Sequence, residues 1–222
     1  MRFKVAFFDL DGTLVDNFFA VHECCNFVER DLGLPVTDYS KVRATVGGSI
    51  VLTMQRLVGP EKAGEAVELY RGYFAGHWAD GLSAMPGAVE LLKNLKAIGV
   101  KSAVLTNKNE VFSRKIVERV GMLPFLSDVI GTSEESAAKL IRKPYPEFTC
   151  LALKRMNATA EESLMVGDSP FDAEAGINAG MTAHLVATGS HSAEELSRLK
   201  VEGVHKNLEE LGRAVFGILS PC

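Results

Sequence analysis

The feature that most constrains this chain is an alternation of short apolar runs with amphipathic helical patterns. Each apolar run is short and is followed by polar residues or glycine, which is typical of a buried strand that ends in a turn. The runs cover residues 3–10, 100–105, 164–166 and 183–186, with a weaker one at 128–130. Strands that alternate with helices predict a parallel sheet covered by helices on both faces.

Helical patterns fill the intervals between these runs. They cover residues 86–98, 110–120, 147–156 and 171–179. Pro86-Gly87 opens the first pattern and Gly99 closes it, and both residue types are common at helix boundaries. We therefore expect a doubly wound, Rossmann-like α/β core formed by residues 1–15 and 85–222.

A block of nearly 70 residues interrupts the alternation between residues 16 and 84. Four helical stretches follow one another there without a convincing strand, at about 18–32, 38–46, 49–57 and 61–79. Asn17, Thr37 and Ser49 are plausible N-caps, and glycines 33, 47 and 59 are plausible helix ends. A block of this length is too long for an ordinary crossover connection. We predict that residues 16–84 form an inserted all-helical cap domain.

The composition is that of an ordinary globular protein. Of the 222 residues, 47% are hydrophobic and 23% are charged, and the net charge is -4. The chain has no long basic run, so we expect no nucleic-acid partner. It has neither a secretory signal nor an apolar stretch of about 18 residues, and its four cysteines show no C-x-x-C spacing. We expect a cytoplasmic protein that does not bind membranes.

Two acidic residues end the first apolar run. Asp9 and Asp11 are two positions apart, so an extended chain presents both carboxylates on the same side. Gly12 allows the sharp turn that follows, and Thr13 can form a hydrogen bond within it. An ordinary polar turn would have the same residues. The position favours a functional site, because parallel sheets bind ligands beyond the carboxyl ends of their strands.

Polar residues also follow a second run and a proline-rich loop. Thr106-Asn107 could simply end a strand, but a hydroxyl and nearby backbone N–H groups can also hold phosphate oxygens. Lys143 lies in Arg142-Lys143-Pro144-Tyr145-Pro146, where the prolines stiffen the loop. A lone lysine is usually a solvated surface charge. A lysine held rigidly beside the strand ends can instead neutralise phosphate.

Two further acidic residues follow the run at 164–166. Asp168 leaves that strand and Asp172 lies one helical turn later, with Ser169 and Pro170 as a plausible helix start. A helix start explains this segment but not why acidic residues gather at two strand ends. Carboxylates brought together repel one another unless a cation joins them. Magnesium prefers oxygen ligands and often binds one or two carboxylates together with substrate phosphate. The pattern therefore favours a metal site.

In their order along the chain, these motifs resemble those of the haloacid dehalogenase-like phosphatases, and within them the phosphoglycolate phosphatase group. The four motifs are Asp9-Leu10-Asp11-Gly12-Thr13-Leu14-Val15-Asp16, Thr106-Asn107, Lys143-Pro144-Tyr145-Pro146 and Gly167-Asp168-Ser169-Pro170-Phe171-Asp172. The likeness covers nearly the whole chain, including a helical cap in the position that this group uses.

The resemblance implies a role for each motif residue. Asp9 would be the nucleophile, and Asp11 the general acid and then the base. Mg²⁺ would be bound by Asp9, the backbone carbonyl of Asp11 and Asp168. The phosphate-binding residues would be Thr106, Asn107 and Lys143, and Asp172, Gly12 and Thr13 would support the site.

The implied activity is magnesium-dependent hydrolysis of small phosphate monoesters, such as phosphoglycolate or sugar phosphates, through an aspartyl-phosphate. Gly47, Gly48 and Ser49, with Arg43 nearby, could approach the substrate from the cap, although a plain helix–helix loop explains them equally well. A phosphomutase acting on hexose phosphate and a non-catalytic protein that binds a phosphate ligand stay open as alternatives. We expect a small phosphorylated metabolite as the partner, and a monomer or a homodimer.

Overall fold

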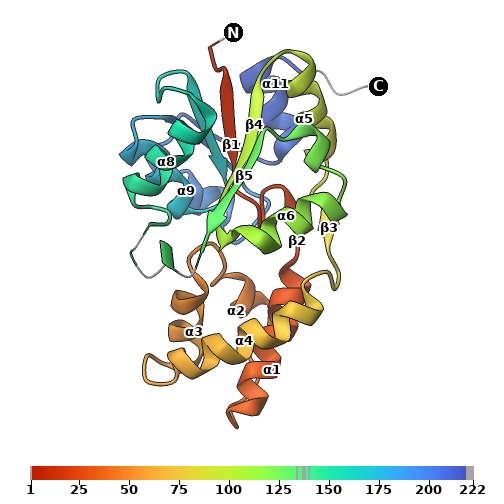
Figure 1. Ribbon diagram of the computed structural model, residues 1–222, viewed down its shortest axis with the longest axis vertical. Helices are drawn as coiled ribbons and strands as arrows, with labels where there is room; N and C mark the ends of the chain where they lie inside the picture. The colour runs from red at the N-terminus through yellow and green to blue at the C-terminus, as the bar shows by residue number, and fades with distance from the viewer. Residues whose placement is uncertain (1, 134, 137–138, 140, 219–222) are drawn as a thin grey trace.

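A parallel sheet forms the centre of the larger part of the molecule, and four helices form the smaller part (Figure 1). The computed structural model describes residues 2–133, 135–136, 139 and 141–218. The strands of the sheet are β1 (Val5–Phe8), β4 (Lys101–Asn109), β5 (Asp128–Thr132), β6 (Ser163–Gly167), β7 (Thr182–Val186) and β8 (Gly203–His205). Within these residues the strand order is β5-β4-β1-β6-β7-β8 and every pairing is parallel. The predicted α/β fold is confirmed.

Helices cover both faces of this sheet, as Figure 1 shows. They are α5 (Ala88–Ala97), α6 (Glu110–Arg119), α8 (Pro146–Met156), α9 (Pro170–Asn178), α10 (Ala193–Leu196) and α11 (Leu208–Phe216), with the 3₁₀ turn η1 (Leu123–Phe125). All four residues of β1 are buried. Such burial requires cover on both faces, and it explains why β1 reads as a continuous apolar run rather than an alternating one.

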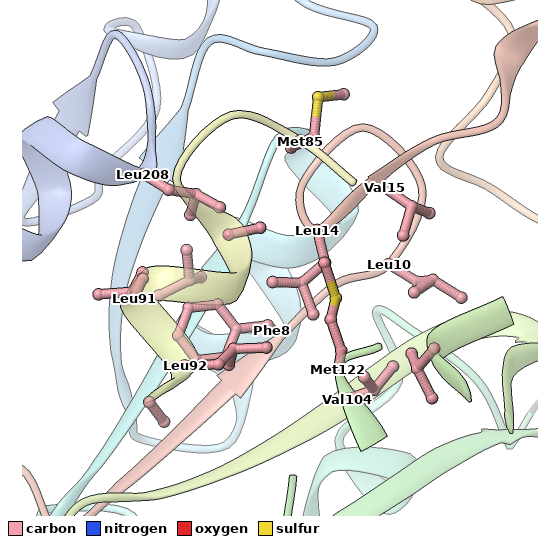
Figure 2. Close-up of a cluster of buried hydrophobic side chains, with 14 of the residues drawn as sticks. Phe8, Leu10, Leu14, Val15, Met85, Leu91, Leu92, Val104, Met122 and Leu208 are labelled. Carbon is pink, nitrogen blue, oxygen red and sulfur yellow. The ribbon is translucent and has the colours of Figure 1, made fainter. Parts of the chain in front are cut away.

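Neighbouring residues of β1 contribute to different halves of the core. Phe8 packs with Leu92 of α5, Val104 of β4 and Leu208 of α11 (Figure 2). Phe7 belongs to a second cluster that contains Phe148 of α8. Successive side chains of a strand point to opposite faces, so one short strand anchors helices on both sides of the sheet.

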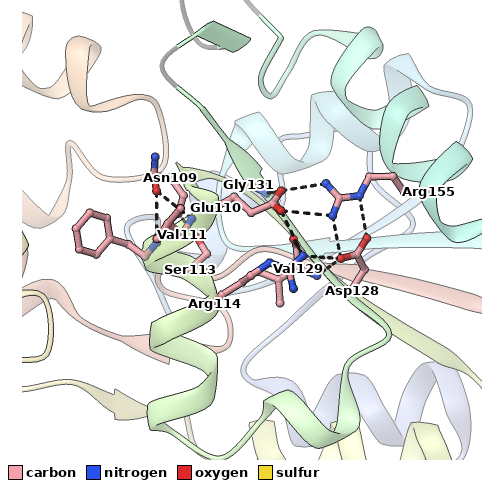
Figure 3. A network of polar contacts seen from close by, with 10 residues as sticks. Asn109, Glu110, Val111, Ser113, Arg114, Asp128, Val129, Gly131 and Arg155 are labelled. Carbon is pink, nitrogen blue, oxygen red and sulfur yellow. Dashed lines mark hydrogen bonds and ion pairs between the residues drawn. The ribbon is translucent and has the colours of Figure 1, made fainter.

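An ion cluster joins the edge strand β5 to α6 and α8 (Figure 3). Arg155 donates from Nε to Asp128 Oδ2 at 2.8 Å and from Nη1 to Glu110 Oε2 at 3.0 Å. Arg114 donates from Nη2 to Asp128 Oδ1 at 2.9 Å. Partial burial would raise the pKa of both acids, but the hydrogen bonds from Arg155, from a backbone N–H and from Arg114 together more than offset it, so both pKa values are lowered. The cluster therefore fixes β5, which pairs with another strand on one side only, to α6 and α8.

The smaller part consists of α1 (Phe18–Asp31), α2 (Tyr39–Arg43), α3 (Ile50–Val58) and α4 (Ala63–His77). Their buried side chains, among them Cys24, Met54 and Tyr70, form an apolar cluster of their own. No helix in the described residues is long and apolar enough to cross a membrane.

The helix starts in this part agree only partly with the expected caps. Ser49 caps α3, because its side chain accepts a hydrogen bond from the backbone N–H of Leu52. Thr37 does not cap α2; its backbone N–H and hydroxyl donate to the buried carboxylate of Glu29, and the N-cap is Asp38. Asn17 occupies the N-cap position of α1 without a capping side-chain bond.

The chain passes between the two parts at a short two-stranded ribbon. β2 (Val15–Asp16) and β3 (Ser83–Ala84) pair antiparallel, with Val15 opposite Ala84. The prediction that residues 16–84 contain no strand is therefore wrong at both ends of that block. We propose residues 16–84 as a cap domain, because both crossings lie at this ribbon and the helices between them share their own cluster.

Candidate active site

The carboxyl ends of β4, β1 and β6 meet where the sheet faces the cap. β1 pairs with β4 on one side and β6 on the other, which brings Asp9, Thr106 and Asp168 to one edge. β4 does not end at Leu105 as expected, because it continues to Asn109 after an irregularity in its pairing with β5. Such an irregularity can re-aim side chains next to an active site.

A buried lysine links two of the acidic residues. The Lys143 side chain is fully buried, with Nζ 2.8 Å from Asp9 Oδ1 and 2.6 Å from Asp172 Oδ1. Burial by itself would lower the pKa of Lys143, but the Asp172 and Asp9 carboxylates more than offset it, so this pKa is raised above its ordinary value. The lysine is therefore held as a permanent cation between two carboxylates.

Asn107 holds the loop that carries this lysine. Its Oδ1 accepts from the backbone N–H of Lys143 at 2.7 Å, and its Nδ2 donates to the carbonyl oxygen of Lys143 at 3.1 Å. These two hydrogen bonds occupy the side-chain amide of Asn107, which the sequence predicted to bind phosphate. Asn107 borders the cavity all the same.

Asp172 has both carboxylate oxygens occupied. Oδ1 bonds Lys143, while Oδ2 accepts from the backbone N–H of Ser169 at 3.1 Å and from its hydroxyl at 2.6 Å. These bonds form a capping box at the start of α9, where Pro170 takes the first helical position. Asp172 thus holds both the lysine and the start of α9 in place.

Hydrogen-bond donors and the backbone of neighbouring loops surround the Asp168 carboxylate. Its Oδ1 accepts from the Thr13 hydroxyl at 3.0 Å and its Oδ2 from the backbone N–H of Ser190 at 3.0 Å. Gly12 has φ +83°, and a Cβ there would lie 2.8 Å from Asp168 Oδ2, so only glycine fits. Burial, and then the nearby Asp172 and Asp9, raise the pKa of Asp168 to about 8.

These acidic residues offer a donor set that suits a hard divalent cation. Carboxylate oxygens of Asp9, Asp168 and Asp172 lie within 4.8 Å of one another, and all three residues are buried. Lys143 is their one fully buried lysine partner among the described residues. An all-oxygen set with excess negative charge is the kind that Mg²⁺ binds. Asp172 is already bonded to the Lys143 cation, whereas the donors to Asp168 are a neutral hydroxyl and a backbone N–H, so Asp168 is better placed than Asp172 to bind it.

Asp11 is paired with a lysine that the sequence did not predict. Lys108 Nζ lies 2.7 Å from Asp11 Oδ2, while Asp11 Oδ1 is buried without a hydrogen-bond partner in the described part of the chain. Lys108 Nζ also lies 4.9 Å from the ring centroid of Phe74 in the cap. Lys108 lies beyond Leu105, where the expected strand ended, so no local pattern in the sequence assigned it to Asp11.

A cavity of about 260 Å³ lies between the sheet edge and the cap. Asp9, Asp11 and residues 106–109 line it from the core, and residues 46–51 and Phe74 line it from the cap. Gly47, Gly48 and Ser49 therefore line the cavity from the cap side. Arg43 is not among the lining residues, because its guanidinium donates to the carbonyl oxygens of Thr188 and Gly189 instead.

Known proteins are similar to this chain over nearly its whole length. Residues 3–180 match the haloacid dehalogenase-like hydrolase family. "Probable phosphatase IndB" of Dickeya dadantii is 31% identical over 96% of this chain and 93% of its own length. A phosphoglycolate phosphatase of Caulobacter vibrioides is 29% identical over 97% of this chain and 92% of its own length.

A solved structure extends the likeness to the fold. The haloacid dehalogenase-like family protein of Streptococcus pneumoniae aligns with a TM-score of 0.86 at 20% identity, and the alignment covers 98% of this chain and 99% of that one. The match to the family spans most of the chain and contains Asp9, Asp11, Lys143, Asp168 and Asp172. The chain therefore belongs to the haloacid dehalogenase-like hydrolases.

Proposed function

We propose that this protein is a magnesium-dependent phosphatase that hydrolyses small phosphate monoesters through an aspartyl-phosphate on Asp9. The observation that carries the proposal is that Asp9 and Asp11 line a cavity that cap residues also line, with Lys143 Nζ 2.8 Å from Asp9 Oδ1. The names of the relatives from Dickeya dadantii and Caulobacter vibrioides support the reaction class.

The first step forms the covalent intermediate. One oxygen of Asp9 attacks phosphorus, and the bond from phosphorus to the leaving oxygen breaks as Asp11 donates a proton to that oxygen. Lys108 occupies Asp11 Oδ2, so Oδ1 is the oxygen placed to carry the proton. Lys143 compensates charge beside Asp9, while the Thr106 hydroxyl, which accepts from Lys108 N at 3.3 Å, keeps its own hydrogen for a phosphate oxygen.

The second step regenerates the enzyme. Water attacks the phosphorus of the aspartyl-phosphate, Asp11 accepts the proton of that water, and inorganic phosphate leaves while the Asp9 carboxylate is restored. Mg²⁺, bound by Asp9, the Asp11 carbonyl and Asp168, would offset the repulsion between the Asp9 carboxylate and the phosphate dianion.

The cavity favours a small substrate. Its volume of about 260 Å³ lies below the roughly 300–1,000 Å³ of pockets that hold drug-sized ligands. Phosphoglycolate and small sugar phosphates are the candidates that we propose.

Phosphate release from a panel of small monoesters, with Mg²⁺ and with chelator, tests the proposal. We expect magnesium-dependent turnover with one preferred ester. We expect Asp9→Asn to retain less than about a tenth of the wild-type rate, because the covalent route needs this carboxylate. A higher residual rate would exclude Asp9 as the nucleophile. Isomerised hexose phosphate without phosphate release would indicate a phosphomutase, and binding without either reaction would indicate a phosphate-binding protein.

A further inference from the structure

Arg43 connects the cap to the loop that follows β7. It is the last residue of α2, and its guanidinium donates from Nη2 to the Thr188 carbonyl oxygen at 2.9 Å and from Nε to the Gly189 carbonyl oxygen at 3.2 Å. Its Cζ lies 4.6 Å from the ring centroid of Phe18, at the start of α1. The half-buried side chain therefore spans from the cap to the backbone of a core loop.

The 188–190 loop lies directly against Asp168. The backbone N–H of Ser190 donates to Asp168 Oδ2 at 3.0 Å, and the Thr188 hydroxyl donates to the carbonyl oxygen of Gly12 at 2.7 Å. A Cβ at Gly189 would overlap the Asp168 carboxylate, so the loop backbone has no room to approach further. Any displacement of this loop therefore moves a hydrogen-bond donor of Asp168.

The cap makes a second contact in the same region. A Cβ at Gly47 would lie 3.2 Å from Ser169 Cβ and 3.7 Å from Ser190 Oγ, so the backbone at Gly47 lies close to both serines. Ser169 bonds Asp172 and Ser190 bonds Asp168. The segment from Arg43 to Gly47 thus rests on the two loops that hold these carboxylates.

We propose that Arg43 is a positioning residue, which ties the cap to the 188–190 loop and so keeps Asp168 in place for the cation. The proposal rests on the function proposed above. Arg43 itself touches neither the carboxylates nor the cavity, so its effect on the cation passes through the loop. Two carbonyl oxygens accept from two different nitrogens of one guanidinium, a geometry that a lysine ammonium reproduces only in part.

Calorimetric titration of the full chain with Mg²⁺ tests this proposal without depending on turnover. We expect Arg43→Ala to weaken Mg²⁺ binding about tenfold, because partners of metal ligands typically contribute 10–100-fold to metal affinity. Arg43→Lys should weaken it less. Arg30→Ala is the matched control, since Arg30 is an exposed cap arginine at the end of α1 and should leave the affinity unchanged.

Two further readouts separate positioning from general destabilisation. The kcat of Arg43→Ala should fall at low Mg²⁺ and return largely at saturating Mg²⁺, which a misfolded fraction would not do. Trp78, the single tryptophan, packs against both the core cluster and the cap cluster. Acrylamide should therefore quench its fluorescence more strongly in Arg43→Ala than in Arg30→Ala.

A double-mutant cycle tests whether Arg43 affects Mg²⁺ binding through the 188–190 loop. Thr188→Val removes the bond to Gly12, and its effect on Mg²⁺ affinity should be smaller in the Arg43→Ala background than in the wild type, because both changes act through one loop. Wild-type Mg²⁺ affinity in a folded Arg43→Ala protein would overturn the inference while leaving the phosphatase proposal intact. If Arg43→Ala does not fold, unchanged Mg²⁺ affinity in Arg43→Lys would overturn it. A wild-type protein that binds no Mg²⁺ would overturn both proposals.

Discussion

At the residue scale, Lys143 is the buried cation that pairs with two carboxylates of the site. Its side chain is fully buried and holds Asp9 and Asp172 at 2.8 and 2.6 Å. Removing one partner of a buried ion pair leaves an uncompensated charge in a place that water cannot reach. We therefore expect Lys143 to contribute to stability as well as to the proposed binding of phosphate.

We expect Lys143→Met to lower the free energy of unfolding by about 3–5 kcal/mol, the usual cost of breaking a buried ion pair from one side. Phosphate release should fall by about a hundredfold or more, because the anion then faces three carboxylates without the lysine. Urea unfolding and steady-state kinetics measure the two effects. Lys93→Met, at an exposed position on α5, is the control. A Lys143→Met protein as stable as this control would show that the buried pair contributes no net stability.

Individual site residues differ in how far the sequence could predict them. Asp9 and Asp11 could be found because their spacing and the preceding apolar run are local features. Lys108 could not be assigned to Asp11, because that ion pair depends on the extension of β4 beyond Leu105. Ser190 could not be found either, since its backbone N–H reaches Asp168 from a loop more than twenty positions away.

At the scale of elements, β7 and β8 contain a pair of histidines, of which His184 is buried and His205 is half-buried. His184 Nδ1 lies 2.9 Å from His205 Nε2, and the two rings stack. Burial, and then the nearby His205, lower the pKa of His184 from 6.5 to about 4. Between these two pH values the unfolded chain binds a proton that the folded chain rejects. The unfolding free energy should therefore fall as the pH falls through this window.

The pH prediction can be checked with a single substitution. His184→Asn removes the titrating group, so its urea midpoint should decline less than that of the wild type between about pH 6.5 and about pH 5. Well above pH 6.5 the His184 ring is neutral in the folded and in the unfolded chain, so the stability curves of the two proteins should run parallel there. Thr182→Ser, on the same strand, removes no titrating group and should keep the wild-type slope. Parallel curves for His184→Asn and the wild type would show that His184 does not control this slope.

The elements that sequence patterns predicted are those that are long or buried on both sides. β1 and β6 read as apolar runs because every one of their residues is buried. β8 spans only Gly203–His205 and becomes a strand through its pairing with β7, which no local pattern records. The ribbon of β2 and β3 has two residues in each strand and joins positions far apart in the chain, so it was missed for the same reason.

At the scale of the whole molecule, the cap touches the catalytic core on two flanks. On one flank Arg43 contacts the loop that bonds Asp168. On the other flank the Phe74 ring lies 4.9 Å from Lys108 Nζ and makes an edge contact with Phe112 at 5.3 Å. Lys108 in turn bonds Asp11. The cap therefore contacts the 188–190 loop, which bonds Asp168, on one flank and Lys108, which bonds Asp11, on the other.

The Phe74 flank gives a prediction about substrate binding. In Phe74→Leu an apolar side chain remains in the cap, but the aromatic face over Lys108 is lost. A cation over an aromatic ring contributes about 0.5–2 kcal/mol, so we expect the KM to rise about fivefold as Lys108 and the cap wall loosen. Tyr73→Leu is the matched control on the same helix, because Tyr73 stacks on Phe27 and His77 within the cap and does not line the cavity. Steady-state kinetics with the preferred ester should separate the two variants. If both raise KM equally, the effect comes from general loosening of the cap, and the contact between Phe74 and Lys108 has no specific role in binding.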